Sequence, residues 1–227
     1  MSSHSVTLPQ LLAPDVAARV AAALADAPFS DGRATAHGGA RDAKRNQQLE
    51  PAHPLAREHG ATLVAALNRS ERFMSLALPH TILPFTFAQY EVGMAYGEHL
   101  DLPIVGTPNG PLRTDLSLTI FLSPPDAYDG GELVIPGDDG PRTIKGGPGD
   151  AFLYPSDTLH RVAPVTRGQR LVAITWIQSL VPDAEQRAIL AGIGDSVIAM
   201  HTAGAPDADV TRLRQVQHKL LRRWARA

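Results

Sequence analysis

Residues 115–122 read DLSLTIFL, a stretch in which polar and apolar side chains alternate almost strictly. Because successive side chains of a β-strand point to opposite faces, Asp115, Ser117 and Thr119 are expected to share one face. The apolar residues between them are expected on the other face, where they can enter a hydrophobic core. The stretch therefore predicts a strand with one polar and one apolar face.

Short segments of the same character recur on both sides of this stretch. They are separated by glycine, proline and aspartate, as in the turn sequence GDDG at 137–140. The further strands that we predict are residues 82–92, 131–135, 142–145, 151–154, 160–165 and 170–178. Many short strands joined by such turns predict an antiparallel sandwich or jelly roll. The fold class that follows is mainly β with flanking helices.

Helical patterns precede this β region. Apolar residues recur at helical spacing over 11–27, where Pro14 suits the first turn, and again over 54–68. The stretch 31–48 between them is polar and contains several glycines, so we interpret it as a loop or an edge hairpin. We therefore predict that residues 1–79 are N-terminal helices and loop packing on the β core.

The chain becomes helical again after the last predicted strand. A helix of about 16 residues is expected to run toward Met200, with acidic residues in its first turn. Asp207 or Asp209 can cap a last helix that reaches Arg226. The division that we predict is the N-terminal part at 1–79, the β core at 80–180 and a C-terminal helical appendage at 181–227.

Composition excludes several classes of protein. With 227 residues, 44% of them hydrophobic, the chain can form one domain with a substantial core. Its net charge of −2 gives no sign of a nucleic-acid or membrane partner, and the basic stretch 219–226 has charges favoured at a helix C-terminus. The chain has no cysteine, so disulfides and thiolate metal sites are excluded. Without a signal-peptide pattern or an apolar run of ~20 residues, we expect a cytoplasmic protein.

Three residues of the β region have the chemistry of a metal site. His99 and Asp101 are two positions apart, so in an extended segment both side chains point to the same side. His160 stands at the start of another predicted strand. Two imidazoles and one carboxylate suit Fe(II), Mn(II) or Zn(II), and on one face of an iron they leave positions open. The other seven histidines lack such a context and are interpreted as structural or surface residues: His4, His37, His53, His59, His80, His201 and His218.

Arg170 adds a second kind of binding group to these ligands. It lies on the strand after His160, and a turn around 166–168 would bring it back toward that histidine. A guanidinium binds a carboxylate through two parallel hydrogen bonds and stays charged at any working pH. The pattern therefore predicts a metal site beside which a carboxylate co-substrate is bound.

These residues lie within longer motifs that resemble a known family. The motifs are, in chain order, YEVGMAYGEHLD at 90–101, RTDLSLTIFLS at 113–123, YDGGEL at 128–133, GDAFLYPS at 149–156, HRVAPV at 160–165, GQR at 168–170 and Trp176. They resemble the prolyl-4-hydroxylase-like branch of the Fe(II)/2-oxoglutarate dioxygenases. More closely, the chain resembles the bacterial PKHD-type hydroxylases, some of which are associated with iron uptake. The resemblance covers most of 80–180 and extends more weakly to 44–49.

The resemblance implies a double-stranded β-helix in which His99, Asp101 and His160 bind iron and Arg170 binds the distal carboxylate of 2-oxoglutarate. By strand phase, Tyr90 and Ser117 are further candidates for contact with this co-substrate. Trp176 shares the face of Arg170, where it either shapes the pocket or belongs to the core. The activity implied is hydroxylation of a C–H bond with O2, which releases succinate and CO2, and L-ascorbate is a possible additional cofactor.

Several alternatives remain open from the sequence. The same ligands would serve a non-catalytic sensor of iron or 2-oxoglutarate, or a zinc hydrolase that needs no Arg170. The sequence does not identify the substrate, which is either a small molecule or a peptidyl side chain. We expect the substrate contacts on the stretches 31–48 and 102–112, the second of which is either a lid or an ordinary linker. The C-terminal helices either dock on the core or form a homo-oligomer.

Overall fold

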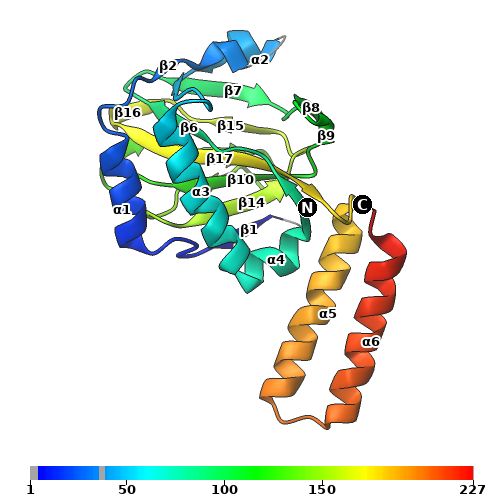
Figure 1. The fold of residues 1–227 in the computed structure, drawn as a ribbon. Helices are drawn as coiled ribbons and strands as arrows, with labels where there is room; N and C mark the ends of the chain where they lie inside the picture. Colours follow the sequence, from blue (N-terminus) through cyan, green and yellow to red (C-terminus); the bar gives the residue numbers. More distant parts are fainter. Residues whose placement is uncertain (1–4, 36–38, 227) are drawn as a thin grey trace.

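The computed structural model describes residues 5–35 and 39–226, and it contains two β-sheets that face each other (Figure 1). His4 and His37, which we interpret as structural or surface residues, lie outside the described residues. Nearly all strand pairs are antiparallel partners from distant parts of the chain. The predicted jelly roll, a double-stranded β-helix with flanking helices, is therefore confirmed.

The major sheet has eight strands and carries most of the core. The order of seven of them is β1 (Val6–Leu8), β14 (Ala151–Pro155), β10 (Leu116–Phe121), β17 (Arg170–Ser179), β6 (Thr86–Tyr90), β4 (Gln47–Gln48) and β2 (Ser30–Asp31). The eighth, β5 (Pro79–Ile82), pairs with the far end of β17. Because β10 and β17 occupy the centre, both of their faces are covered.

The minor sheet has five strands and lies opposite the major one. Its order is β13 (Arg142–Ile144), β12 (Leu133–Ile135), β15 (His160–Val162), β7 (Ala95–His99) and β3 (Lys44–Arg45). Two two-stranded sheets complete the β structure. One pairs β11 (Tyr128–Gly130) with β16 (Val165–Gly168), and the other is a hairpin of β8 (Ile104–Thr107) and β9 (Gly110–Arg113).

The alternation in β10 divides the interior into two hydrophobic clusters. Leu116, Leu118 and Ile120 pack with the helices on the outer face of the major sheet. Phe121 belongs to the second cluster, which fills part of the space between the two sheets. Ser117 and Thr119 are buried as well, so the polar face of this strand is directed into the protein and not into solvent. Such buried hydroxyls need partners, and they find them at the candidate site.

Helices cover the outer face of the major sheet. They are α1 (Pro14–Ala23), α3 (Pro54–Arg69) and α4 (Glu71–Ala77), and Figure 1 shows them next to the strands of the major sheet. The two long predicted helices are confirmed, and Pro54 stands in the first turn of α3 as Pro14 does in α1. Helix α4 was not predicted, although Ser70 is a legible N-cap that accepts a hydrogen bond from the Phe73 amide at 3.2 Å.

The stretches 31–48, predicted as a loop or an edge hairpin, and 102–112, predicted as a lid or a linker, both contain regular structure, and β2 and β4 pair at the edge of the major sheet. Within 31–48 the described residues form a 3-10 turn η1 (Gly32–Thr35), a short helix α2 (Gly39–Asp42) and edge strands of both sheets. The stretch 102–112 forms most of the β8–β9 hairpin, and whether this hairpin acts as a lid or as an ordinary linker stays a prediction. Residues 1–79 thus contribute strands to both sheets in addition to the predicted helices and loop, because edge pairing is decided by distant partners.

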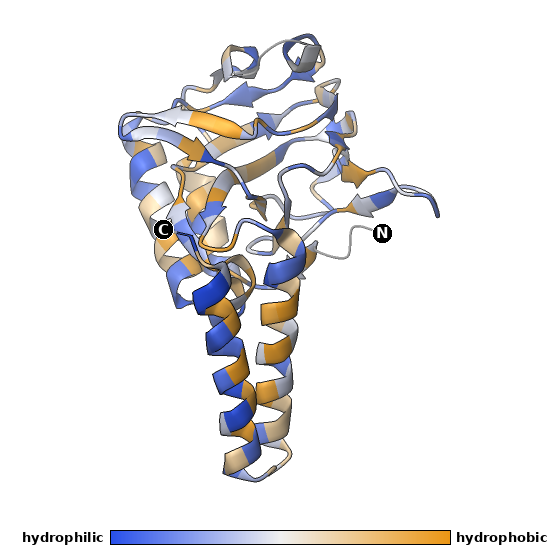
Figure 2. Cartoon of the chain, turned by 90° about the vertical axis from the view of Figure 1, so that its right-hand side faces the viewer, coloured by the Kyte–Doolittle hydropathy of each residue, from blue (hydrophilic) through white to orange (hydrophobic). Residues whose placement is uncertain are grey.

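The chain ends in two antiparallel helices, α5 (Ala184–Thr202) and α6 (Asp207–Trp224), that project away from the β core (Figure 2). Asp183 caps α5 by accepting a hydrogen bond from the Gln186 amide at 2.8 Å. The prediction that Asp207 or Asp209 caps α6 is wrong, because Pro206 occupies the cap position without a side-chain hydrogen bond. Apolar side chains remain exposed on this hairpin: Ile189, Ile198 and Val216. No described helix is long and apolar enough to cross a membrane.

Candidate active site

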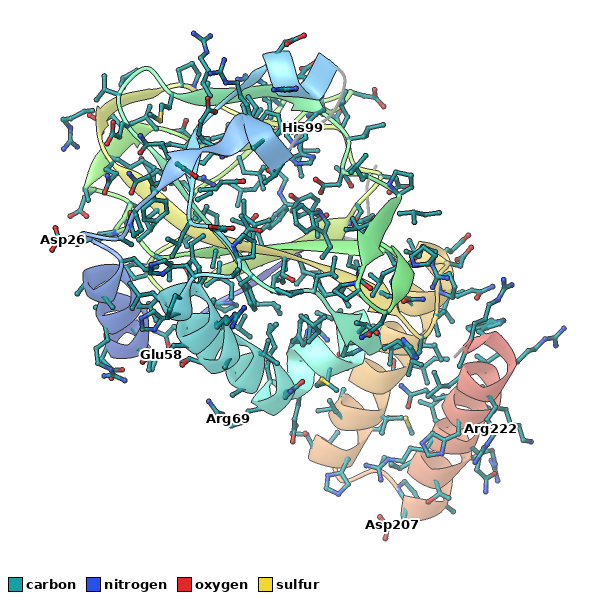
Figure 3. The ribbon with its side chains drawn as sticks, turned by 45° about the horizontal axis from the view of Figure 1, so that its top comes forward. Asp26, Glu58, Arg69, His99, Asp207 and Arg222 are labelled. Carbon is teal, nitrogen blue, oxygen red and sulfur yellow. The ribbon has the colours of Figure 1, made fainter. Side chains whose placement is uncertain are left out.

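The three predicted metal ligands come together between the two sheets. Strands β7 and β15 are neighbours, and His99 stands directly opposite His160 in their register. Asp101 follows β7 by two residues. One ligand atom from each side chain lies within 4.8 Å of the other two. In Figure 3, His99 lies in the layer that carries β7, near the short helix α2. Pairing of two sequence-distant strands thus creates the cluster that the sequence predicts.

Both imidazoles are held in the same tautomer by backbone carbonyls. The Nδ1 of His99 donates to the carbonyl of Gly97, and the Nδ1 of His160 donates to that of Thr158, each at 2.8 Å. A carbonyl can only accept, so Nδ1 carries the proton and Nε2 keeps its lone pair. Such hydrogen bonds orient imidazoles that bind metals. The Tyr96 ring stacks on His99, with the ring centroids 3.5 Å apart, and restricts its rotation further.

The electrostatics of the cluster favour a neutral His99. Burial lowers the pKa of His99 to about 4, and the nearby His160 lowers it in addition. A neutral imidazole is the form that coordinates a metal, and protons therefore compete little with a cation at neutral pH. The carboxylate of Asp101 supplies the negative charge that a divalent ion requires.

The metal-free protein should become less stable as the pH falls from about 6.5 to about 4. The pKa of His99 is lowered to about 4 in the folded state, so in this window the unfolded chain binds more protons than the folded one. The free energy of unfolding should fall by about 1 kcal/mol per pH unit from this residue alone. Urea unfolding of metal-free protein at several pH values measures the slope. A His99→Gln variant with an unchanged slope would contradict this assignment.

Asp101 is oriented by two buried hydroxyls. Ser117 on β10 donates to Asp101 Oδ2 at 2.5 Å, and its oxygen lies 2.9 Å from the hydroxyl oxygen of Ser156. Ser117 and Ser156 are both buried. The polar face of β10 therefore supplies a hydrogen bond to Asp101, a role that the alternation of the sequence does not specify. Ser117 holds the carboxylate by this hydrogen bond, and it is not among the residues that line the neighbouring cavity.

Replacing Ser117 with alanine should weaken Fe(II) binding by about 10–100-fold, because groups that orient metal ligands contribute on this scale. Fe(II) titration under anaerobic conditions measures the effect. Ser196→Ala is a matched control, since that serine is exposed on α5 and bonds only to its own helix. Equal iron affinity in the Ser117→Ala protein and the control would show that the hydroxyl does not position Asp101.

A cavity of about 340 Å³ opens beside the ligand cluster. Strands from both sheets line it, together with Leu102, with Val105 of β8, and with four residues near the edge of the sheets: Thr35, Lys44, Asn46 and Gln48. Its size is within the range of small-molecule sites, roughly 300–1,000 Å³. The stretches 31–48 and 102–112, where we expect substrate contacts, therefore both reach the cavity that contains the metal cluster.

Arg170 lines this cavity and is only 1% exposed. It is the first residue of β17, opposite Tyr90 of β6, and its guanidinium lies 5.0 Å from the centroid of the Tyr90 ring. Its Nε and one terminal nitrogen are buried without a hydrogen-bond partner among the described residues. No carboxylate in the described part of the chain forms an ion pair with it. A buried, unpaired guanidinium is costly unless a ligand supplies the counter-charge.

The other candidate residues have distinct positions. Tyr90 lines the cavity beside Arg170, and burial raises the pKa of its hydroxyl. Trp176 lines the cavity too, six residues beyond Arg170 on the same face of β17, and its indole nitrogen has no partner among the described residues. Of the two readings of Trp176, the structure thus favours the one that shapes the pocket.

Sequence reasoning missed several groups at the site. Lys44 lines the cavity from the short strand β3, and Asn46 lines it from the single residue between β3 and β4. The hydroxyl of Tyr154 lies 3.4 Å from His160 Nε2. The signal for Tyr154 was legible, because it shares one face of its strand with Phe152 in alternation. Lys44 and Asn46 gave no periodic signal, since two-residue strands are too short for one.

The histidines interpreted as structural or surface residues stay away from the site where they are described. His53 caps α3 by accepting a hydrogen bond from the Leu55 amide at 3.3 Å, and His80, His201 and His218 are exposed. His59 is partly buried in α3. Among the described residues, His99, Asp101 and His160 form the metal-capable group.

Comparison with known proteins agrees with this geometry. The family model of the 2OG-Fe(II) oxygenase superfamily matches residues 85–178. A crystal structure of a Pseudomonas putida prolyl-4-hydroxylase has a TM-score of 0.53 at 21% identity, over 78% of this chain and 92% of that chain. The structure of HygX from Streptomyces hygroscopicus, with nickel and 2-oxoglutarate bound, has a TM-score of 0.57 at 12% identity, over 78% of this chain and 84% of that one. These likenesses show the fold.

The fold and the histidine–aspartate–histidine cluster define a 2-oxoglutarate- and Fe(II)-dependent oxygenase. A PKHD-type hydroxylase of Pseudomonas putida is 45% identical over 96% of this chain and 97% of its own length. One of Bordetella pertussis is 42% identical over 96% of this chain and 98% of its own. The chain therefore belongs to the PKHD-type hydroxylases, and it is an Fe(II)- and 2-oxoglutarate-dependent hydroxylase.

Proposed function

We propose that His99, Asp101 and His160 bind Fe(II) and that Arg170 binds the distal carboxylate of 2-oxoglutarate in the same cavity. The observation that carries this proposal is the pairing of a compact ligand cluster with a buried guanidinium that has no acidic partner among the described residues. A cation site and an anion site that share one cavity match a co-substrate with two carboxylates, one near the metal and one distant from it.

The donor set fits iron. Two neutral imidazole nitrogens and one carboxylate oxygen are the ligands of non-haem Fe(II) oxygenases, and they leave positions open on the ion. The Nδ1 hydrogen bonds to Gly97 and Thr158 leave a lone pair on each Nε2, and one ligand atom of each residue lies within 4.8 Å of the others.

The surroundings of Arg170 fit a carboxylate. The side chain is buried against Tyr90 and Phe121, so an anion that reaches it is shielded from water. A guanidinium offers two parallel hydrogen bonds to a carboxylate, and these charge-assisted bonds are stronger than neutral ones. Tyr90 lies beside this position, and we propose that it borders the bound co-substrate. For Ser117 we propose support of Asp101 in place of a direct co-substrate contact.

Bound Fe(II) and 2-oxoglutarate supply the oxidising chemistry with O2. The protein's own residues orient these groups and limit access of water. Trp176, Tyr154 and Leu102 line the space next to the ligand cluster, where a substrate C–H bond must be placed. A cavity of about 340 Å³ that also holds the co-substrate admits only a small reacting group.

Formation of succinate from 2-oxoglutarate tests the proposal directly. The protein with Fe(II), 2-oxoglutarate and O2 should release succinate and CO2, and L-ascorbate should prolong the activity by keeping iron reduced. A non-catalytic sensor would bind 2-oxoglutarate without releasing succinate. A zinc hydrolase would show metal-dependent activity in the absence of O2. The absence of succinate from fully loaded protein under all conditions would refute the assignment.

Further features of the function remain predictions. The link to iron uptake rests on the resemblance of the chain to PKHD-type hydroxylases. A cytoplasmic location, the lack of nucleic-acid and membrane partners, and the three-part domain division rest on the sequence. A homo-oligomer would cover the apolar side chains on the C-terminal hairpin, and sedimentation analysis can determine the oligomeric state. The substrate is predicted to be a small molecule or a peptidyl side chain.

A further inference from the structure

Lys44 is a second buried cation at the same cavity. The side chain is 5% exposed and lines the cavity together with His99 and Arg170. It is the first residue of β3, which adds to the edge of the minor sheet with Lys44 opposite Tyr96. The Lys44 ammonium lies 5.3 Å from the centroid of the Tyr96 ring. Lys44 and Arg170 therefore belong to opposite sheets.

The position of Lys44 is built by neighbouring residues. Its ammonium donates to the Thr35 hydroxyl at 2.7 Å, and that hydroxyl in turn donates to Gln48 Oε1 at 2.7 Å. The strand can approach β7 because residue 97 is glycine: a Cβ there would lie 2.8 Å from the Cβ of Ala43. The chain then crosses from the minor to the major sheet between β3 and β4, and it closes the cavity at this edge.

Lys44 has no acidic partner among the described residues. The ion pairs of the described chain leave it out, and one neutral hydroxyl occupies one of its three N–H donors. Burial lowers the pKa of Lys44 to about 8, which expresses the cost of its charge at this place. Long exposed lysines are common on surfaces, but a buried one without a counter-ion calls for a ligand.

The charges at the cavity point to the same conclusion. Asp101 is the acidic side chain among the described lining residues, whereas Lys44 and Arg170 are both basic. Fe(II) adds two positive charges and 2-oxoglutarate two negative ones. One positive charge is then left over at the cavity, beside two cationic side chains that are themselves buried. A further anion would restore neutrality, and the open donors of Lys44 are where it would bind.

We propose that Lys44 binds a negatively charged group of the primary substrate, so that this hydroxylase acts on small acids. This inference rests on the proposed function, because it assumes that iron and 2-oxoglutarate occupy the other two charged positions. The acidic group lies at the edge formed by β3, and the C–H bond that reacts lies beside the iron. The free acid and an acidic end of a peptide share this chemistry, and the cavity of about 340 Å³ favours the small molecule.

Ligand retention tests the proposal without relying on turnover. Wild-type protein loaded anaerobically with Fe(II) and 2-oxoglutarate is incubated with the small-molecule fraction of a cell extract, and in parallel with its peptide fraction. Retained compounds are identified by mass spectrometry and anion exchange. The expected result is a retained acid from the small-molecule fraction, with retention reduced about ten- to a hundredfold in Lys44→Met, as for loss of a charged hydrogen bond. The methyl ester of that acid should bind the wild type as weakly as the acid binds the variant.

Arg45→Met is the matched control, because Arg45 is the next residue on β3, carries the same charge and is exposed. It should retain the acid like the wild type. Lys44→Arg, which keeps the charge, should recover part of the retention, and the affinity for 2-oxoglutarate should be the same in all variants. Retention of a neutral or cationic compound, of a peptide, or of no acid other than 2-oxoglutarate would overturn the proposal. Equal retention by Lys44→Met would overturn it too. Succinate formation by the wild type, measured separately, shows whether the proposed function itself has failed.

Discussion

His99→Ala and Asp101→Ala should each abolish formation of the anaerobic complex of protein, Fe(II) and 2-oxoglutarate. That complex should show a weak visible charge-transfer band in the wild type, because the co-substrate and the iron are in direct contact. Each substitution removes one of three ligands whose atoms lie within 4.8 Å of one another. Substitution of groups that merely orient a ligand lowers metal affinity or activity by about 10–100-fold, so loss of a ligand should exceed about a hundredfold in turnover.

Absorbance titration and succinate release measure this effect. His80→Ala and His201→Ala are suitable controls, since both histidines are exposed and far from the cluster in sequence. The ligand variants should stay folded when metal-free. His99→Ala loses one hydrogen bond to the Gly97 carbonyl and its packing against Tyr96, and Asp101→Ala loses the hydrogen bond from Ser117. A band of normal intensity in either ligand variant would contradict the assignment of the metal site.

Arg170→Met should weaken 2-oxoglutarate binding roughly ten- to a hundredfold, the effect of losing charge-assisted hydrogen bonds. In the absence of co-substrate, this substitution should not lower the free energy of unfolding. Arg170 is buried and has no acidic partner in the described chain, so an apolar side chain of similar length removes a costly charge from the interior. Weaker 2-oxoglutarate binding together with an unchanged or higher free energy of unfolding would indicate that Arg170 has a binding role and not a structural one.

The measurement is thermal or urea unfolding with and without 2-oxoglutarate. Co-substrate at a hundred times its dissociation constant should stabilise the wild type by about 2.7 kcal/mol and the variant by much less. Arg167→Met is the control, because Arg167 is exposed and pairs with Asp129 on the surface. If Arg170→Met unfolded more easily without co-substrate yet bound it normally, Arg170 would be a structural residue.

Most of the β core could be predicted from local patterns. Alternation predicted the segment that became β10 and placed Ser117 and Thr119 on one face. The face shared by Arg170 and Trp176 followed from the same rule. These predictions succeeded because the period of a strand is fixed by backbone geometry and is visible within a few residues. The ligands His99 and Asp101 were recognisable for the same reason.

Other parts of the site could not be read from the chain. Strands β3 and β4 are two residues long, and the strands that join them to the sheets, β7 and β6, lie more than 40 residues away in the sequence. No local period identifies such a strand, so 31–48 was interpreted as a loop or hairpin. The prediction for the N-cap of α6 was wrong because two aspartates near the helix start looked equally suitable from the sequence. In the structure both lie within the first turn, and Pro206 occupies the cap position.

The sequence by itself determined which chemistry is available: two histidines and an aspartate that can hold a metal, and an arginine that can bind a carboxylate. It also indicated membership in the PKHD-type hydroxylases, which the relatives show. Only the tertiary structure decided that Ser117 donates to Asp101 and that Arg170 has no acidic partner among the described residues. It also decided that Lys44 closes the cavity as a second buried cation. The physical reason is that residue types specify which bonds a group can make. Which groups lack a partner depends on how distant strands pair, and that is a property of the whole fold.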